Sequence, residues 1–388
     1  MKTPVPDSIR SADAVSDGEG AIPLARPSIT ERERRYVNDV LHSTQLALGP
    51  WMERFEERMA ERCGTRHAVA VSSGTAALHC IVRALGLGSG DEVITTPFSF
   101  VASANALLFE GVRPRFVDID PETYNLDASR VEAAITPRTK AILAVDVFGV
   151  PADWPALTDL ADKHDLALID DACEALGSTI EGTPIGRWGD AAAFGFYPNK
   201  QITTGEGGCI TTDSAALAKR CRSLRNQGRA DGGPMRHDRL GYNYRMSELT
   251  AALGCAQLER LPDLIAARSD VAARYATALA PLADHLALPS ALTSETVSPF
   301  VYVARLRDHF AADARDRLME DLQDRDIGCA PYFPAIHLQP LYRDRFGHAP
   351  GDFPTCESVA SRTLALPFYP GLSSGEIDYV AGALRELL

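Results

Sequence analysis

The sequence has 388 residues, enough for two or three domains or for one large and one small domain. Its 45% apolar and 23% charged residues are typical of a globular protein and exclude collagen-like, coiled-coil and wholly disordered chains. The 39 Lys and Arg residues against 52 Asp and Glu residues give a net charge of −13, which argues against a nucleic-acid partner. No segment approaches 18 uninterrupted apolar residues, so no membrane partner is expected.

The eight cysteines show no Cys-x-x-Cys spacing, which argues against a zinc knuckle or a thioredoxin-type site, and we expect no metal. Several cysteines lie in apolar surroundings, which predicts reduced, buried thiols in a cytoplasmic protein. The first 20 residues lack the apolar region of a secretion signal. Their Ser, Asp and Gly content predicts a disordered leader over residues 1–21.

Strand and helix patterns alternate through the first two thirds of the chain. Strands are predicted over residues 67–72, 92–96, 115–118, 141–147, 166–170, 191–196 and 209–212. Helices are predicted over residues 30–41, 52–63, 75–85, 101–110, 126–135 and 153–164, with Thr30 and Asp153 as N-caps and Gly86 as a stop. This alternation indicates a mostly parallel sheet that is covered on both faces.

The pattern changes after Met246. A long helical region follows to about residue 279, interrupted by Pro262. A strand is predicted over residues 298–306, a helix over 311–325, and a last helix over 374–387 that is capped by Ser374. We therefore expect a large α/β domain over residues 22–260 and a smaller C-terminal α/β domain over residues 261–388.

The segment Ser73-Gly74-Thr75 stands between a predicted strand and a predicted helix. Free N–H groups at a helix N-terminus bind anions, Gly74 lets an anion approach the backbone, and the two hydroxyl groups add donors. The alternative is a Ser N-cap in a tight turn without a ligand. The segment is neither a Walker A loop nor a Gly-x-Gly-x-x-Gly fingerprint.

Two further candidates follow buried strands. Asp170 and Asp171 end one strand, where ligands bind in open α/β sheets, or one of them caps the next helix. Lys200 follows another strand and is either a solvated loop residue or an amine in a desolvated pocket that can form a Schiff base. A phosphate site, a carboxylate and a lysine are together what pyridoxal phosphate requires.

With these residues the chain resembles the DegT/DnrJ/EryC1/StrS aminotransferases. Members of this family are fold-type I pyridoxal-phosphate enzymes, and most of them act on nucleotide-linked keto sugars. The resemblance runs from about residue 22 to the C-terminus. Its landmarks are residues 49–50, 67–78, 95–105, 148–153, 171–177, 194–208, 224–228, 241–253 and 331–342.

The resemblance implies a role for each matching cofactor residue. Lys200, in Tyr-Pro-x-Lys, corresponds to the lysine that forms the Schiff base with pyridoxal phosphate and then carries the proton. Asp171 corresponds to the partner of the pyridine nitrogen, Phe100 to the aromatic residue that stacks on the ring, and Glu174 to a residue near the 3′-oxygen.

The phosphate contacts are implied in the same way. Gly74 and Thr75 match the phosphate-binding segment, to which Ser73 belongs, and Asn243 matches an asparagine that reaches the phosphate of the neighbouring subunit, so a homodimer is expected. Many relatives have a phosphate-binding Ser where this chain has Gly195, which leaves Asn199 or water as the replacement donor.

On the substrate side, His337 resembles a position that lines the sugar-nucleotide cleft, and Arg229 and Arg245 either bind a diphosphate or form structural ion pairs. The pattern Ile-Thr-Thr-Gly-Glu-Gly-Gly at residues 202–208 resembles members that aminate C4 of 4-keto-6-deoxy sugars. The expected activity is amino transfer from glutamate or glutamine to such a nucleotide-linked sugar. The alternatives are amination of a cyclitol, a dehydratase reaction, and a non-catalytic regulatory protein. An NAD-linked sugar enzyme is not favoured, because this chain lacks the glycine fingerprint of such enzymes.

Overall fold

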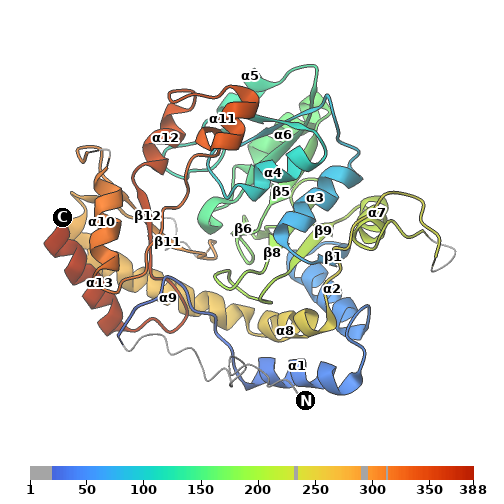
Figure 1. The fold of residues 1–388 in the computed structure, drawn as a ribbon, viewed down its shortest axis with the longest axis horizontal. Coiled ribbons are helices and arrows are strands. Elements are labelled where there is room, and N and C mark those ends of the chain that lie inside the picture. The colour runs from blue at the N-terminus through green and yellow to red at the C-terminus, as the bar shows by residue number, and fades with distance from the viewer. Residues whose placement is uncertain (1–19, 231–234, 290–295, 312) are drawn as a thin grey trace, which may run out of the picture.

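The computed structural model describes residues 20–230, 235–289, 296–311 and 313–388, and the predicted leader falls outside them except for its last two residues. A seven-stranded sheet in the order β1-β9-β8-β5-β4-β2-β3 forms the centre of the molecule (Figure 1). Its strands are β1 (His67–Val71), β2 (Glu92–Thr95), β3 (Arg113–Phe116), β4 (Thr139–Val145), β5 (Ala167–Asp171), β8 (Ala191–Gly195) and β9 (Gly208–Thr212). Only β9 runs antiparallel to both of its neighbours, so the sheet is mostly parallel, as predicted.

Helices cover both faces of this sheet, because its strands send alternate apolar side chains to each face. In β4, Leu143 belongs to the same buried cluster as residues of α3 and α7, whereas Ile142 belongs to the cluster that contains residues of α2, α6 and α8. The helices of this part are α1 (Glu31–Ser43), α2 (Pro50–Cys63), α3 (Gly74–Ala84), α4 (Ala102–Phe109), α5 (Ala128–Ala134), α6 (Trp154–His164), α7 (Ala215–Arg225) and α8 (Glu248–Glu259). A small hairpin is formed by β6 (Thr179–Ile180) and β7 (Thr183–Pro184).

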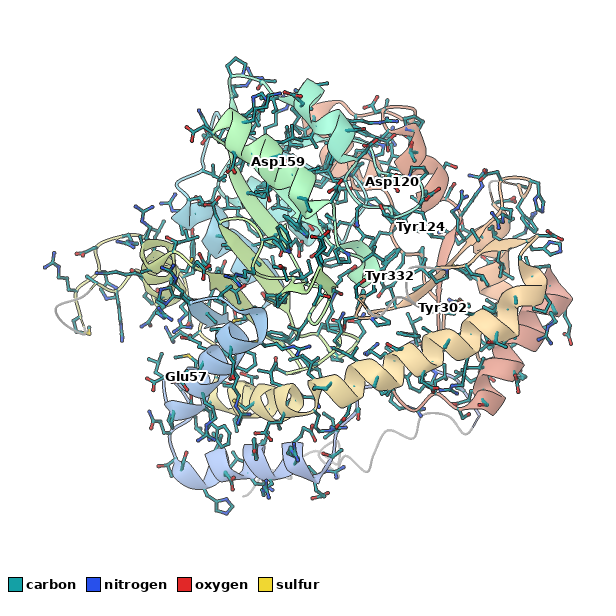
Figure 2. All side chains as sticks on the ribbon, turned by 180° about the vertical axis from the view of Figure 1, so that it is seen from behind. Glu57, Asp120, Tyr124, Asp159, Tyr302 and Tyr332 are labelled. Carbon is teal, nitrogen blue, oxygen red and sulfur yellow. The ribbon has the colours of Figure 1, made fainter. Side chains whose placement is uncertain are left out.

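A second, three-stranded antiparallel sheet lies in the C-terminal part of the chain. It is formed by β10 (Leu286–Ala287), β11 (Tyr302–Leu306) and β12 (Thr363–Leu366). Its helices are α9 (Leu261–Leu279), α10 (Ala314–Gln323) and α13 (Ser374–Leu387). Seen from behind, the long α9 continues from α8 along the lower edge of the molecule to this sheet (Figure 2).

Two segments cross the predicted boundary between the domains. Helices α11 (Pro340–Phe346) and α12 (Pro354–Ala360) lie beside the large sheet, where the Tyr342 hydroxyl donates to Asn105 Oδ1 at 2.7 Å. Ile22, near the N-terminus, pairs instead with the C-terminal part through its N–H, which donates to the Asp326 carbonyl at 2.9 Å. The large part therefore includes residues from after position 260, and the C-terminal part includes residues from before position 261.

The predicted strands and helices named above are confirmed with shifts of a few residues at their ends. One cap is wrong: Ser373, not Ser374, accepts from the Glu376 N–H at 3.2 Å, while the Glu376 side chain accepts from the Ser373 N–H. This reciprocal pair is a capping box, which fixes the first turn one residue earlier. The small hairpin, α7, α11, α12, β10 and β12 were not predicted.

The eight cysteines are free thiols, and all but Cys173 are buried. No helix of the described residues is long and apolar enough to cross a membrane.

The first helix depends on a buried carboxylate. Glu33 accepts hydrogen bonds from the Thr30 N–H, from Gln257 Nε2 and from Arg260 Nη1 at 2.6–2.8 Å, which ties α1 to α8 and to the start of α9. Burial alone would raise the pKa of Glu33, but the hydrogen bonds from Thr30 and Arg260 outweigh it and lower the pKa to about 2.

We therefore expect Glu33→Gln to lower the free energy of unfolding by about 2 kcal/mol at pH 7. Because the pKa is lowered on folding, the contribution of Glu33 is complete above its ordinary pKa of 4.5 and is lost as the pH falls towards 2. Urea unfolding at pH 7 and at pH 3 measures both values, and the difference between the two proteins should shrink at pH 3. Glu31→Gln, in the same turn but exposed, is the control; an equal loss in both variants would contradict the prediction.

Candidate active site

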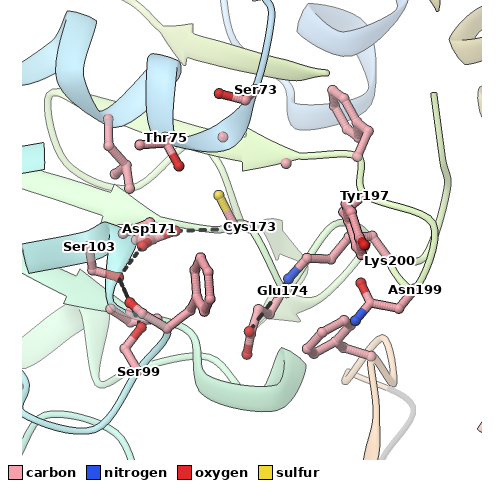
Figure 3. A pocket seen from close by; sticks show the side chains of 18 of the residues that line it. Ser73, Thr75, Ser99, Ser103, Asp171, Cys173, Glu174, Tyr197, Asn199 and Lys200 are labelled. Carbon is pink, nitrogen blue, oxygen red and sulfur yellow. Dashed lines mark hydrogen bonds and ion pairs between the residues drawn. The ribbon is translucent and has the colours of Figure 1, made fainter. Parts of the chain in front are cut away.

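A cavity of about 520 Å³ opens where three parallel strands end. Val145, Asp171 and Gly195, the last residues of β4, β5 and β8, all line it. The start of α3, the segments around residues 99–103 and 195–200, and three aromatic residues from beyond residue 299 form the rest of its wall (Figure 3). The carboxyl edge of a parallel sheet is where α/β enzymes bind ligands.

The segment Ser73-Gly74-Thr75 lies on this wall, as the first turn of α3. Ser73 is the N-cap, and its hydroxyl accepts from the Ala76 N–H at 3.0 Å. The same segment therefore caps α3 and faces the cavity. A Cβ at Gly74 would lie 2.8 Å from Cys173 Sγ and 3.2 Å from Gly195 Cα. Glycine is therefore required for α3 to begin so close to β5 and β8.

Asp171 faces the cavity, and Asp170 points to the other side of the sheet. The Ser103 hydroxyl donates to Asp171 Oδ2 at 2.6 Å, and the Cys173 N–H donates to Oδ1 at 3.3 Å. Asp170 accepts instead from the Gly186 N–H at 3.1 Å. No helix begins between β5 and β6, so the alternative in which one of these residues caps a helix is wrong.

The Lys200 side chain enters the cavity and is only 15% exposed, so it is not a solvated loop lysine. Its Nζ lies 3.5 Å from Glu174 Oε1 and 3.9 Å from the centroid of the Phe300 ring. Glu174 Oε2 accepts from the Phe148 N–H at 2.9 Å. Burial raises the pKa of Glu174, and the neighbouring Lys200 limits this rise.

Phe100 and Asn199 complete the predicted residues that line the cavity. Phe100 is 60% exposed and is therefore not part of the core. Asn199 Nδ2 donates to the Tyr332 hydroxyl at 3.1 Å, and its Oδ1 is buried without a partner among the described residues. Figure 3 shows Asn199 beside Lys200 and far from Ser73 and Thr75, so the structure does not bring it to the start of α3.

Four other predicted residues do not line this cavity. Asn243 is exposed, on the bridge that it forms with Asn226. Arg245 Nη1 donates to Asn226 Oδ1 at 3.0 Å, and neither Arg245 nor Arg229 forms an ion pair with the residues that the structure describes. His337 is completely buried, with Nε2 3.0 Å from Glu357 Oε1, so nothing in the cavity can touch its ring in this conformation.

Several lining residues were not predicted. They are Ser99, Ser103, Cys173, Tyr197, Glu206, Phe300, Tyr332 and Phe333. Tyr197 and Tyr332 fall within landmark segments of the resemblance, which is a signal that could have identified them. Ser103 carries the same signal, because it lies in the landmark segment 95–105. Phe300 lies in the cavity only because distant segments meet there, and no local pattern marks it.

The charge of the cavity wall is negative. Lys200 is the one Lys or Arg among the lining residues in the described part of the chain, whereas Asp171, Glu174 and Glu206 are acidic. An anionic ligand larger than a single phosphate therefore needs positive charge from outside this wall.

A pair of buried carboxyl groups lies behind Asp171. Asp146 Oδ1 accepts from the Ala152 N–H and from Trp154 Nε1, both at 2.8 Å. Asp146 Oδ2 and Asp170 Oδ1 have no donor among the described residues, and the two carboxyl groups interact with each other. Burial and then their mutual interaction raise the pKa of Asp170, and burial raises the pKa of Asp146 to about 7. A single proton between the two carboxyl groups would satisfy both unpartnered oxygen atoms, and burial favours this protonated form.

The mostly parallel sheet and the ligand-sized cavity at its carboxyl edge define an enzyme of the α/β class. Residues 27–385 match the DegT/DnrJ/EryC1/StrS aminotransferase family. The chain belongs to this family, and it is an aminotransferase.

Individual relatives agree over nearly their whole length. GDP-perosamine synthase from Caulobacter vibrioides is 40% identical over 369 residues, which cover 95% of this chain and 98% of that protein. The structure of PseC from Helicobacter pylori, an aminotransferase involved in the biosynthesis of pseudoaminic acid, has a TM-score of 0.90 at 29% identity and covers 95% of this chain and 99% of its own. DesV from S. venezuelae has a TM-score of 0.85 at 37% identity, covering 92% and 94%. These matches confirm the predicted fold class.

The shared proton predicts a particular pH dependence of stability. Because folding raises the pKa of these carboxyl groups, the folded state holds a proton that the unfolded chain releases, and stability falls as the pH rises from about 4 to about 7. In Asp170→Asn the amide oxygen still accepts from Gly186, and the amide N–H₂ gives Asp146 a donor at every pH. We expect the free energy of unfolding of the wild type to fall by about 1–3 kcal/mol more than that of the variant between pH 4 and pH 8.

Urea unfolding at four pH values across this range measures the difference. Asp153→Asn is the control, because an asparagine caps α6 as well as an aspartate does and lies outside the pair. Parallel pH profiles for the wild type and Asp170→Asn would show that no proton is shared.

Proposed function

We propose that this aminotransferase uses pyridoxal phosphate, held covalently by Lys200, to move an amino group from glutamate or glutamine to C4 of a nucleotide-linked 4-keto-6-deoxy sugar. The observation that carries the proposal is the Lys200 amine, buried in a cavity that also holds Asp171 and the first turn of α3. The family match and the relatives reported above support the same activity.

The residues of the cavity fit this cofactor. The glycine-dependent approach of α3 leaves room for a phosphate against its free N–H groups, and Phe100 presents an exposed ring to the same space. The unpartnered Oδ1 of Asn199 is a buried polar atom that a ligand can satisfy. When bound, pyridoxal phosphate supplies a carbonyl group for amines and a ring that accepts electrons.

The chain's own residues then have distinct tasks. Asp171, held by Ser103, keeps its carboxylate directed into the cavity, where it stabilises a protonated ring nitrogen. Ser73, Gly74 and Thr75 bind the phosphate through the first turn of α3. Lys200 Nζ, 3.5 Å from Glu174, holds and moves the proton that changes place during amino transfer.

The acceptor is proposed from the sequence pattern and one relative. The segment at residues 202–208 resembles that of C4-aminating members, and the Caulobacter vibrioides relative is named GDP-perosamine synthase. A guanosine diphosphate sugar is therefore the first acceptor to test. The eight free cysteines support a reducing compartment, the cytoplasm.

The active unit is proposed to be a homodimer with shared sites. The cavity wall contains one cation, whereas the phosphate, the donor and a nucleotide sugar all carry negative charge. Residues 226–230 and 235–245 carry the half-buried Arg229 and Arg245 and the exposed Asn243, Met235 and Leu240. A second copy of the chain that packs on this surface can bring those side chains to the neighbouring cavity.

The first experiment is a visible absorption spectrum of the protein with pyridoxal phosphate. We expect an absorption band that depends on Lys200 and that L-glutamate removes, because transfer of the donor's amino group leaves the cofactor in its amine form and releases the donor as a 2-oxo acid. Lys200→Ala should lack the band and should lose at least about a thousandfold in rate. Lys163→Ala, which removes an exposed lysine, is the control and should behave as the wild type.

The acceptor is tested by adding 4-keto-6-deoxyhexoses linked to GDP, dTDP or UDP to the glutamate-treated protein. The sugar that restores the band is the acceptor, and NMR of the product identifies the aminated carbon. If a nucleotide-linked 3-keto-6-deoxyhexose restored the band and no 4-keto sugar did, only the proposed position would be contradicted. The absence of any Lys200-dependent band would contradict the cofactor and the mechanism.

The shared site is tested with mixed dimers of Lys200→Ala and Asn243→Ala chains. We expect each variant to be weak or inactive alone at limiting cofactor. In an equal mixture, half of the dimers are hybrids with one intact site, so activity should recover to about a quarter of that of the wild type. If Asn243 acts within its own chain, no hybrid has an intact site and the mixture stays as weak as its components.

A further inference from the structure

Arg268 is a buried arginine in the middle of α9, at the junction of the two parts of the molecule. It is 3% exposed, and its guanidinium group makes hydrogen bonds only to backbone carbonyl groups. Nη2 donates to the carbonyl groups of Asn199, at 3.2 Å, and of Lys200, at 2.7 Å. Nη1 donates to the carbonyl group of Phe300 at 3.0 Å.

These three carbonyl groups belong to the two segments that place the Lys200 amine. Lys200 O and Asn199 O fix the backbone from which the lysine side chain starts. Phe300 supplies the ring that lies 3.9 Å from Lys200 Nζ. One planar group therefore holds both the base of the lysine side chain and the surface on which its amine rests.

The neighbouring side chain of Gln201 holds the backbone at Glu174 in a similar way. Gln201 Nε2 donates to the carbonyl group of Glu174 at 2.5 Å and to that of Ser298 at 3.1 Å. The carboxylate of Glu174 is the group 3.5 Å from Lys200 Nζ. We call residues 196–207, between β8 and β9, the lysine loop. The backbone around the amine is thus held by Arg268 from the C-terminal part of the chain and by Gln201 from the lysine loop itself.

The charge of Arg268 has no carboxylate partner. Within the described residues it forms no ion pair and its Nε has no hydrogen-bond acceptor, while its guanidinium carbon lies 5.6 Å from the centroid of the Phe368 ring. Burial lowers the pKa of Arg268 to about 10, so it remains protonated at neutral pH. A buried, unpaired cation is costly, and packing alone would be served better by an apolar side chain. The cost is understandable if the hydrogen-bond geometry of the guanidinium group is needed.

We propose that Arg268 is a positioning residue for Lys200. Arg268 keeps the Lys200 amine aligned because it holds the backbone of the lysine loop against Phe300. The proposal rests on the role of Lys200 given above. Lysine cannot fully replace arginine at this position. Its single ammonium group does not match three carbonyl groups that are arranged around the planar fork of a guanidinium group. An error of about 1 Å in such a position costs about a hundredfold in rate.

The test compares Arg268→Met, Arg268→Lys and the control Arg315→Met. Arg315 is a suitable control because its Nη1 also donates to two buried backbone carbonyl groups, those of Ala360 and Thr363, but away from the cavity. For each protein loaded with pyridoxal phosphate we measure the visible circular dichroism of the bound cofactor, kcat and KM with glutamate, and the melting temperature.

We expect Arg268→Met to lose visible circular dichroism per bound cofactor and to lose about 30- to 100-fold in kcat, with a smaller change in KM for glutamate. Arg268→Lys should recover part of both signals. Arg315→Met should lower the melting temperature but keep the dichroism and kcat of the wild type. If Arg268→Met does not fold, an intermediate dichroism and kcat in Arg268→Lys supports the proposal.

Wild-type dichroism and kcat in Arg268→Lys and in any folded Arg268→Met, with only a lower melting temperature, would overturn the positioning role. This result differs from a failure of the proposed function. In that case the wild-type protein itself would show no Lys200-dependent band.

Discussion

The amine of Lys200 and the carboxyl groups of Asp171 and Glu174 lie together in one cavity, and all three side chains are largely buried. Buried charges are tolerated only when opposite charges and hydrogen bonds compensate them. Here the Lys200 amine lies 3.5 Å from Glu174 Oε1 and over the ring of Phe300, and the Ser103 hydroxyl donates to Asp171. Each carboxylate also accepts a backbone N–H, from Cys173 and from Phe148 respectively. This balance constrains the arrangement of all the segments that meet at the cavity.

The same constraint explains the carboxyl pair behind the site. Asp171 follows Asp170 directly on β5, and Asp146 follows the end of β4, so three carboxyl groups meet at one sheet edge. Three negative charges at this distance would repel one another strongly. A proton held between Asp146 and Asp170 reduces that repulsion, and Asp171 is the member of the three that faces the cavity. Asp170 and Asp171 have different surroundings because side chains at adjacent strand positions point to different faces of the sheet.

The sequence predicted the central part of this site well, because local patterns determine it. The glycine turn before α3, the carboxylate at the end of β5 and the lysine after β8 each occur where an apolar strand ends. Parallel strands bring such ends to one edge, so adjacency in space follows from the alternation alone. The residues that escaped prediction, such as Phe300 and Arg268, approach the site from the C-terminal part of the chain. Their roles depend on the way α9 and β11 pack against the lysine loop, and no local periodicity encodes that contact.

The charge distribution also relates the single chain to its substrates. A chain with a net charge of −13 and one cation in its cavity wall repels a nucleotide sugar and a dicarboxylic donor unless positive charge is concentrated nearby. Four arginines, Arg229, Arg236, Arg239 and Arg245, occur within 17 residues on the region that also exposes Met235 and Leu240. Exposed apolar side chains among arginines are typical of surfaces that bind another protein, where Met and Arg are enriched. A second copy of the chain on this surface would add positive charge beside the amine, so dimer formation and substrate attraction would follow from the same residues.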